Sequence, residues 1–314
     1  MLGPRGILEH LSSALIMFLR GPNTESTKGG LSVITRMELF NWQTSAPELP
    51  LGGFMPNNDP VQILNIEGLG PVTAEISATP FATGRGERHQ GSSTGKRNIV
   101  LTLGLNPNWA DQTISSLRQF LYAYLMPEQW VKLRFFSTEL PTVEITGIVE
   151  SFTPNLFSID PEIQVSIICP KPDFIDADVT IVDGIVDDGT TENVIDYIGT
   201  VSTGFELRVR SSTTLLTYLG NLTIVNETIA AAQTFKALAV TIDSNMYFML
   251  NTVRSARKVQ NVFIDNSGAI NILAKMVPSS IWPELNPGEN VFSIKAAESG
   301  QLWTLGYFNR FGGL

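Results

Sequence analysis

The stretch RNIVLTLGLNPNWADQTISSLRQFLYAYLMPEQWVKLRFF, residues 97–136, decides the fold, because it reads as one helix between two strands. Apolar residues alternate with other residues along 99–105 and again along 131–135, which predicts a strand at each place. Between these strands, apolar residues recur on one face of a helix near 109–126. Pro127 ends that helical pattern, because proline cannot continue a helix.

The residues outward from this stretch extend the same pattern. Asn108 and Asp111 offer capping groups, so we expect the helix to begin there. Strand alternation repeats along 143–149 and 163–167. The sequence therefore predicts a first compact β domain over 31–175, made of strands, one helix and further strands.

The second half of the chain predicts a different kind of β domain. Short strand patterns recur there at a spacing of about 8–12 residues, separated by turns, which is typical of a β-sandwich. They lie at 205–209, 222–225, 236–242, 246–250, 261–265, 269–274, 291–295 and 302–308. We therefore expect a sandwich over 201–314. The segment 176–200 between the two domains is acidic and contains no basic residue, and we interpret it as a linker.

Composition agrees with a mainly β protein of two domains. The 314 residues suit two domains by length, and only 16% are charged, against about 25% in a typical domain. Low charge suggests that other protein covers part of the surface. The net charge of −9 argues against nucleic-acid binding, and one cysteine excludes an intrachain disulfide or a cysteine-rich zinc site.

The first thirty residues form a separate N-terminal extension, 1–30. An apolar run at 14–19 follows Arg5, as in a signal peptide, but polar residues interrupt it and no suitable cleavage site follows. A short amphipathic helix is favoured over a signal peptide, and a poorly ordered extension is the third alternative. No other stretch reaches about 18 consecutive apolar residues, so we expect no membrane span.

A polar stretch over 82–97 predicts an exposed loop or a hairpin tip. Its four cationic residues are Arg85, Arg88, Lys96 and Arg97. On an acidic protein this local positive charge suggests docking onto an acidic partner, for instance a neighbouring copy of the chain. A solvated loop without a partner is an equally weighted alternative.

The motifs that would indicate catalysis lack the sequence context that catalysis requires. Ser93 lies in a G-x-S-x-G match, but a nucleophile elbow needs a helix after it, and the predicted strand at 99–105 follows instead. Both histidines, His10 and His89, precede the serine, whereas that fold needs a later one. The acidic segment lacks a calcium-loop pattern. We therefore expect no catalytic residue, no metal and no cofactor.

Five segments carry a pattern when they are taken in order. They are VQILNIEGLGPVTAEIS at 61–77, the stretch 97–136 quoted above, GIVESFTPNLFSIDPEIQVSIICPKPDFI at 147–175, LNPGENVFSI at 285–294 and WTLGYFNRFGGL at 303–314. Together they resemble the distal tail protein family of phages. The second segment contains the family's Arg-headed strand, helix and strand, and the third ends on its C-P-x-P-x-F pattern. The last segment matches its Gly-Gly-Leu finish.

This resemblance implies a structural protein of the virion. Such proteins form a ring, usually hexameric, at the distal end of the tail, and are assembled in the host cytoplasm. Their first domain is a β-sandwich or barrel that makes the ring, and the second is a galectin-like β-sandwich. The implied partners are other copies of the chain, the tail tube protein, the tape measure protein and the tail hub protein. The extension 1–30 and the acidic segment 176–200 depart from the family pattern.

Two other functions compete with this interpretation. The sandwich could be a carbohydrate-binding module that adheres to the host surface, with stacking aromatics among Tyr247, Trp282, Trp303 and Tyr307. Because most of these residues lie inside strand patterns, a place in the core or in an interface is favoured for them. A hydrolase acting through Ser93 receives little weight.

Overall fold

The computed structural model describes most of the chain and divides it into two compact units. The described residues are 34–41, 49–51, 59–155, 161–186, 192–211, 217–228 and 233–314. The helix unit comprises Ser32–Asp178 and Arg310–Leu314, and the sandwich unit contains Val179–Asn309. The extension expected at 1–30 lies outside the described residues. Strands dominate both units, which confirms the mainly β class.

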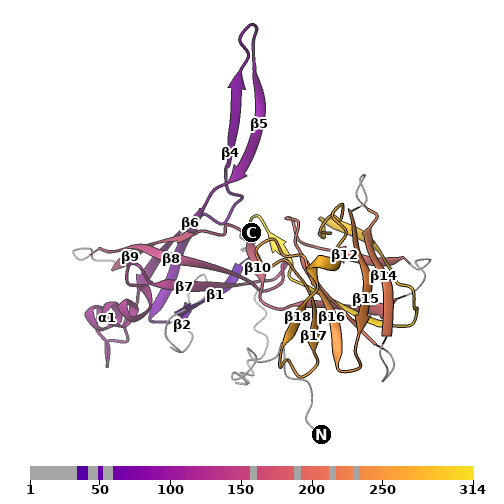
Figure 1. Ribbon diagram of the computed structural model, residues 1–314. Coiled ribbons are helices and arrows are strands. Elements are labelled where there is room, and N and C mark those ends of the chain that lie inside the picture. Colours follow the sequence, from indigo (N-terminus) through magenta and orange to yellow (C-terminus); the bar gives the residue numbers. More distant parts are fainter. Residues whose placement is uncertain are drawn as a thin grey trace. The chain divides into compact units, whose positions relative to one another are not determined.

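A nine-stranded sheet forms the body of the helix unit (Figure 1). Its main path runs β2-β1-β7-β8-β9-β6-β3, and β10 joins it by pairing with both β8 and β21. The strands are β1 Ile34–Asn41, β2 Leu49–Leu51, β3 Val61–Glu67, β6 Arg97–Leu105, β7 Trp130–Ser137, β8 Val143–Pro154, β9 Glu162–Cys169, β10 Phe174–Asp176 and β21 Arg310–Phe311. The short strand β21 comes from the far end of the chain, so the final segment completes the first unit.

The predicted alternation sets the core of this sheet. Ile99, Leu101 and Leu103 on β6 lie in register with β9 and are fully buried. Each such side chain stabilises the fold by about 1.5–3 kcal/mol relative to exposure. The opposite set of β6 side chains is more exposed, because successive residues of a strand point to opposite faces.

The helix α1, Ile114–Leu125, packs Leu117, Leu121 and Leu125 into this core. It begins later than Asn108 and Asp111 predicted, because Thr113 and Ser116 form a reciprocal capping box. Asn108 instead builds the preceding turn. Its carbonyl accepts hydrogen bonds from the N–H groups of residues 111 and 112. No helix in the described ranges is long and apolar enough to span a membrane.

The sandwich unit consists of two facing sheets (Figure 1). The six-stranded sheet has the order β11-β20-β13-β16-β17-β18, and the four-stranded sheet the order β12-β19-β14-β15. The strands are β11 Thr180–Ile185, β12 Asn193–Tyr197, β13 Phe205–Arg210, β14 Thr217–Asn226, β15 Gln233–Ile242, β16 Met246–Asn251, β17 Lys258–Phe263, β18 Ala269–Asn271, β19 Gly288–Lys295 and β20 Leu302–Tyr307, with a 3-10 helix η2 at Leu273–Lys275. Edge-to-face ring pairs join the sheets, for example Phe205 with Phe292 at 5.4 Å.

The acidic segment 176–200 is not the linker that its charge suggested. Strands β11 and β12 lie within it, and each forms an edge of one sheet of the sandwich. The alternation was hidden because β11 turns its isoleucines outward. Gly184 lies opposite Trp303, where an added Cβ would be 2.3 Å from the indole ring. Glycine is therefore required at this position by the ring beside it.

The polar stretch at 82–97 forms most of a hairpin in the helix unit. Strands β4, Ala74–Pro80, and β5, Glu87–Thr94, pair only with each other among the described strands. All seven residues of β4 are exposed. Figure 1 shows this pair, here called the ribbon, extending away from the sheet of its unit.

Replacement of Gly147 by alanine tests the packing inside the nine-stranded sheet. A Cβ there would lie 2.6 Å from Cγ2 of Ile167 and 2.8 Å from Sγ of Cys169. We expect Gly147→Ala to lower the free energy of unfolding by about 1–3 kcal/mol, because the core is overpacked. Urea unfolding measures the change.

Gly306→Ala is the matched control, since a Cβ at this strand position meets only Val179, at 3.5 Å. It should change stability by less than about 0.5 kcal/mol. Equal effects of the two substitutions would contradict the packing described.

Candidate assembly site at the ribbon

The base of the ribbon is built around one buried cation, Arg97. Its guanidinium donates four hydrogen bonds of 2.6 Å to backbone carbonyls, although only 2% of the residue is exposed. Nε binds the carbonyl of Pro172, Nη1 those of Gly68 and Gly70, and Nη2 that of Gly312. Three segments that are distant in sequence are thereby fixed to the first residue of β6.

The arginine fits because its surroundings offer carbonyl oxygens and an aromatic face. Its guanidinium carbon lies 4.5 Å from the centre of the Phe174 ring, a cation–π distance. Gly68 has φ +86°, and a Cβ there would lie 1.9 Å from the carbonyl oxygen of Asn98, so only glycine fits at this position. Burial lowers the pKa of Arg97, while Cys169 and Asp173 favour its charge.

The position of Arg97 corrects the proposed set of surface cations. Arg97 was expected in the docking patch, but its planar donor groups all face inward and are used by carbonyls. It therefore positions the ribbon rather than meeting a partner. The sequence held a signal for this, since Arg97 is in phase with the buried residues Ile99 and Leu101 of the same strand.

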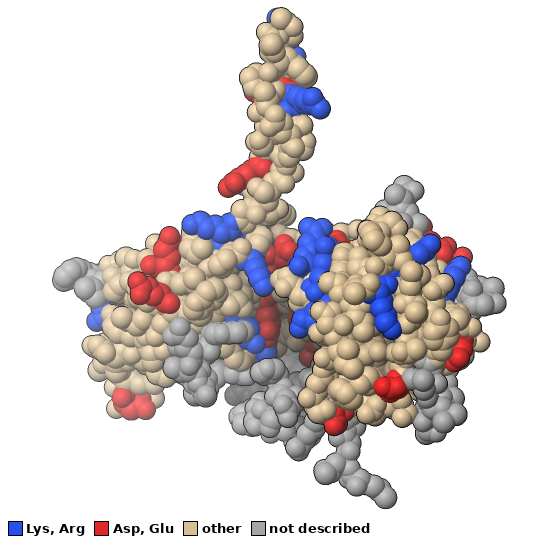
Figure 2. All heavy atoms as spheres, in the orientation of Figure 1, with Lys and Arg blue, Asp and Glu red and all other residues tan. Residues whose placement is uncertain are grey.

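The other three cations remain exposed and separate into two places. Arg85 lies in the turn at the tip of the ribbon, and Arg88 lies on β5 close to that turn. Lys96 lies at the base, just before β6. Figure 2 shows basic side chains toward the tip of the ribbon and acidic ones on it as well, among mostly uncharged atoms. The ribbon also carries Glu75 and Glu87, which balance Arg85 and Arg88, so residues 74–94 have no net formal charge and only the individual arginines are positive.

Ser93 lies in the ribbon and not in a nucleophile elbow. It is an exposed residue of β5 and pairs in register with Glu75 of β4. A nucleophile elbow requires a tight strand-to-helix turn, which is different from this extended geometry. Among the described residues, no group of three or more His, Cys, Asp or Glu side chains could hold a metal ion.

The aromatic residues considered for glycan contact are largely inside the sandwich. Trp303 is 1% exposed, and Tyr247 and Tyr307 are also buried, so Trp303 cannot present a stacking face. Trp282 is half-buried between Phe235, with ring centres 5.9 Å apart, and the Arg257 guanidinium, 5.4 Å from its ring centre. The structure therefore does not bring the two predicted tryptophans together on the surface.

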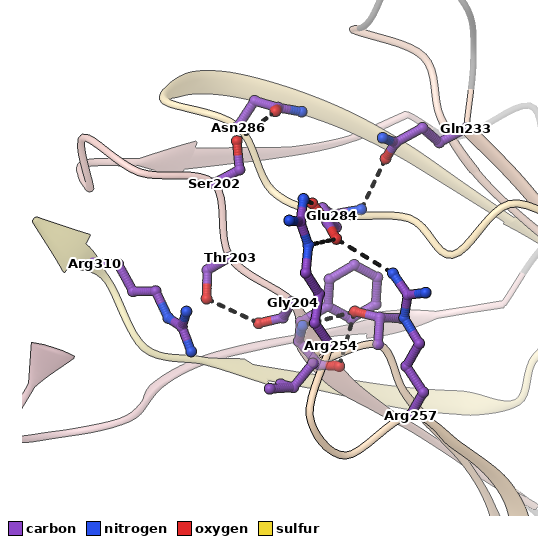
Figure 3. Close-up of polar contacts among 12 residues, drawn as sticks. Ser202, Thr203, Gly204, Gln233, Arg254, Arg257, Glu284, Asn286 and Arg310 are labelled. Carbon is purple, nitrogen blue, oxygen red and sulfur yellow. Dashed lines mark hydrogen bonds and ion pairs between the residues drawn. The ribbon is translucent and has the colours of Figure 1, made fainter. Parts of the chain in front are cut away.

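Sequence reasoning missed a polar cluster around Glu284 in the sandwich unit (Figure 3). Nε and Nη2 of Arg254 bind the two carboxylate oxygens at 3.0 and 3.1 Å, and Arg257 lies 3.5 Å away. The side-chain oxygen of Gln233 accepts the Glu284 N–H at 2.8 Å. These contacts supply hydrogen-bond partners to the buried Glu284 carboxylate and hold the loop before β19 in place. The residues of this cluster lie far apart in the sequence, so no local sequence pattern predicts it.

Sequence reasoning also assigned no role to the exposed apolar side chains around the helix. Trp109, in the turn before α1, is 72% exposed. Phe120 on the helix and Met126 at its end are exposed as well. Large exposed apolar side chains of this kind are enriched at protein–protein contacts. The helix unit therefore carries apolar surface in addition to the ribbon.

Substitution of Arg97 by lysine tests the role of its planar donor group. Lysine keeps the charge but cannot reach four divergent carbonyls with one ammonium group. We expect Arg97→Lys to reduce the free energy of unfolding by roughly 2–4 kcal/mol, because buried carbonyls lose their donors. Arg88→Lys on the exposed ribbon is the control and should be neutral. Equal stability of both variants in urea unfolding would refute the assignment.

Cys169 gives a pH-dependent prediction for the same region. Burial raises the pKa of its thiol to about 12, and the nearby Arg97 cation opposes part of that rise. In the unfolded chain the thiol titrates near about 8.5, so above that pH the unfolded state binds fewer protons. Stability should therefore fall as pH rises from that value toward 12.

Urea unfolding at several alkaline pH values, for the wild type and Cys169→Ala, isolates this contribution. The difference in unfolding free energy between them should shrink as pH rises. A difference that stays constant with pH would contradict the buried, protonated thiol.

Comparison with known proteins identifies the fold. No family model and no curated protein matches the sequence. The crystal structure of the SPP1 Dit protein, described as a paradigm of the hub adsorption apparatus in phages that infect Gram-positive bacteria, matches with a TM-score of 0.62 and 13% identity, over 88% of this chain and 99% of that chain.

Two structures of the phage p2 baseplate, with Sr and with Ca, align with TM-scores of 0.41 and 0.42 and identities of 10% and 9%. They cover 86% and 87% of this chain, and 98% of each matched chain. TM-scores of 0.41 and 0.42 are too low for these two structures to support an argument. Over 88% of its length, the chain has the fold of the SPP1 Dit protein.

Proposed function

We propose that this chain is a structural protein of a phage tail tip, where copies of it form a ring. The observation that carries the proposal is the shared fold, which spans nearly the whole SPP1 Dit chain. The ordered sequence segments that resemble distal tail proteins support it independently, because they come from both units. The ring is hexameric in this proposal and joins the tail tube to the hub and its host-recognition parts.

The described surface supports assembly with other proteins. Trp109 is largely exposed, and the ribbon pairs with no other strand among those described. A protein that worked as an isolated monomer would be expected to cover such features. The low overall charge, 16% of residues, fits a chain whose faces meet other subunits.

The other parts of the proposal follow from the same role. The neighbours are the tail tube protein, the tape measure protein and the tail hub protein, and the location is the virion after assembly in the host. The role is non-enzymatic, in keeping with the extended ribbon geometry of Ser93. The sandwich unit, galectin-like in this proposal, contributes structure rather than glycan binding, because Trp303 is buried.

The exposed cations of the ribbon dock onto acidic surface of a neighbouring subunit or of the tube. Arg85 and Arg88 lie at and near the tip, where they reach furthest from the sheet, and the protein as a whole carries a net charge of −9. Complementary charge of this kind mainly speeds association and fixes the partner.

Ring formation is tested by the mass and shape of the purified full chain. We expect a sixfold species by light scattering at high concentration, and rings by negative-stain electron microscopy. Antibody labelling should place the protein at the tail tip of the virions. A chain that stays monomeric and is absent from virions would contradict the proposal.

Charge reversal tests the docking by the ribbon. Arg85→Glu, Arg88→Glu and Lys96→Glu together should weaken ring formation and make the remaining association less sensitive to salt, because attraction becomes repulsion. Glu87→Lys on the same ribbon is the control and should not weaken it. Unchanged ring mass and tail assembly in the triple variant would disprove docking through these residues.

A further inference from the structure

Strand β11 presents a free edge in the sandwich unit. Within the described part of the chain it pairs with β20 along one side only. Ile185 is 58% exposed on its outward face, Ile181 is similarly exposed, and Leu302 lies directly opposite Ile185 on β20. An exposed apolar edge is a ready template for another strand.

The other edges in the described ranges are less suited to strand addition. The outer edge of β15 is covered, because residues 277 and 281 donate backbone hydrogen bonds to it and Ala237 bridges to Met276. Strands β2 and β18 have three residues each, and the pairing of β3 is interrupted by a register shift. On β12, Asp196 lies opposite Glu289, and like charges at such a position repel. Strand β11 therefore offers the most continuous apolar edge.

The ribbon, like β11, has strand edges without a neighbouring strand. Its pair of strands has no third strand among the described residues and no buried face, and Ile76 is 68% exposed. Phe81 is also exposed at the tip. A two-stranded hairpin alone is marginally stable in water, and a third strand or a packing surface stabilises it.

Length and chemistry make the two edges compatible. Strand β4 has seven residues and β11 has six, so the two edges match in length, with a register shift at Ser77 and Ala78 and no N–H at Pro80 on the β4 side. The ribbon is rich in small side chains such as Ser77 and Ala78, which allow close approach. Asp183 lies on the outward face of β11, and its Oδ1 accepts a hydrogen bond from Thr304 at 2.6 Å. Its other carboxylate oxygen is offered to the arginines near the tip of the ribbon, Arg85 and Arg88.

We propose that the ribbon of one copy adds to the free edge of β11 in a second copy and extends its six-stranded sheet. This inference deepens the proposed function, on which it rests for the presence of neighbouring copies. Main-chain hydrogen bonds supply affinity in strand addition, and the exposed isoleucines supply specificity. This contact joins the helix unit of one copy to the sandwich unit of another.

The first experiment blocks the β11 edge in the full-length chain. Ile185→Lys places a charge on the apolar edge and should weaken self-association by about tenfold or more in sedimentation velocity. Ile76→Lys on the ribbon should have the same effect. Ile270→Lys is the matched control, since this residue is 49% exposed on the opposite edge strand β18. Equal association of all three variants would overturn the inference.

The second experiment traps the contact directly. Copies carrying Ile76→Cys are mixed with copies carrying Ile185→Cys and oxidised mildly. The native Cys169 is buried and does not compete. We expect a disulfide between the two kinds of copy, and none when Ile270→Cys replaces Ile185→Cys.

Three outcomes would overturn the inference: no cross-link, a cross-link of the Ile76→Cys chain with itself, or a cross-link within one chain carrying both cysteines at high dilution. Rings of normal mass with no cross-link would reject this contact and leave the proposed function intact. Failure of the wild-type chain to form rings and its absence from virions would instead reject the function.

Discussion

The structure of the helix unit depends on how one arginine satisfies four backbone carbonyls. Those carbonyls belong to the turn before the ribbon, the loop before β10 and the final segment beside β21. Arg97 itself follows the ribbon directly, so both ends of the hairpin meet at its guanidinium. A buried cation is costly unless it is fully hydrogen-bonded, and here every carbonyl it meets also gains a donor. The geometry fixes the ribbon base while leaving the ribbon exposed.

Both units have regular cores and unusual surfaces. Their cores are conventional, with alternating apolar residues on paired sheets and a helix capped by Thr113. Their surfaces are unusual, because the ribbon, the turn at Trp109 and the edge strand β11 all expose apolar groups. Such features destabilise an isolated chain or promote association, and they favour a protein that reaches its final form in an assembly. The chain shares its fold with the SPP1 Dit protein.

The sequence allowed prediction wherever burial followed a regular period. Strand β6 and helix α1 were predictable because the residues that the core requires recur every two or every three to four positions. Strand β11 was not, because its outward isoleucines and its inward Gly184 invert the usual pattern beneath Trp303. Arg97 was assigned to the surface by its charge, although its phase matched the core. Its true role depends on carbonyls contributed by distant segments, which local patterns do not reveal.

Hydrogen exchange of the full-length protein tests most directly whether Arg97 holds these segments together. In the wild type, the amide of Leu314, which donates to the Leu69 carbonyl, should be protected along with its neighbours at 68–70. In Arg97→Lys, the amides at 68–70, around 172 and at 310–314 should lose protection together. The amides at the centre of β7 should keep theirs, because they exchange only when the whole unit unfolds. Uniform loss across the whole unit, or no loss at these three segments, would contradict the central role given to this arginine.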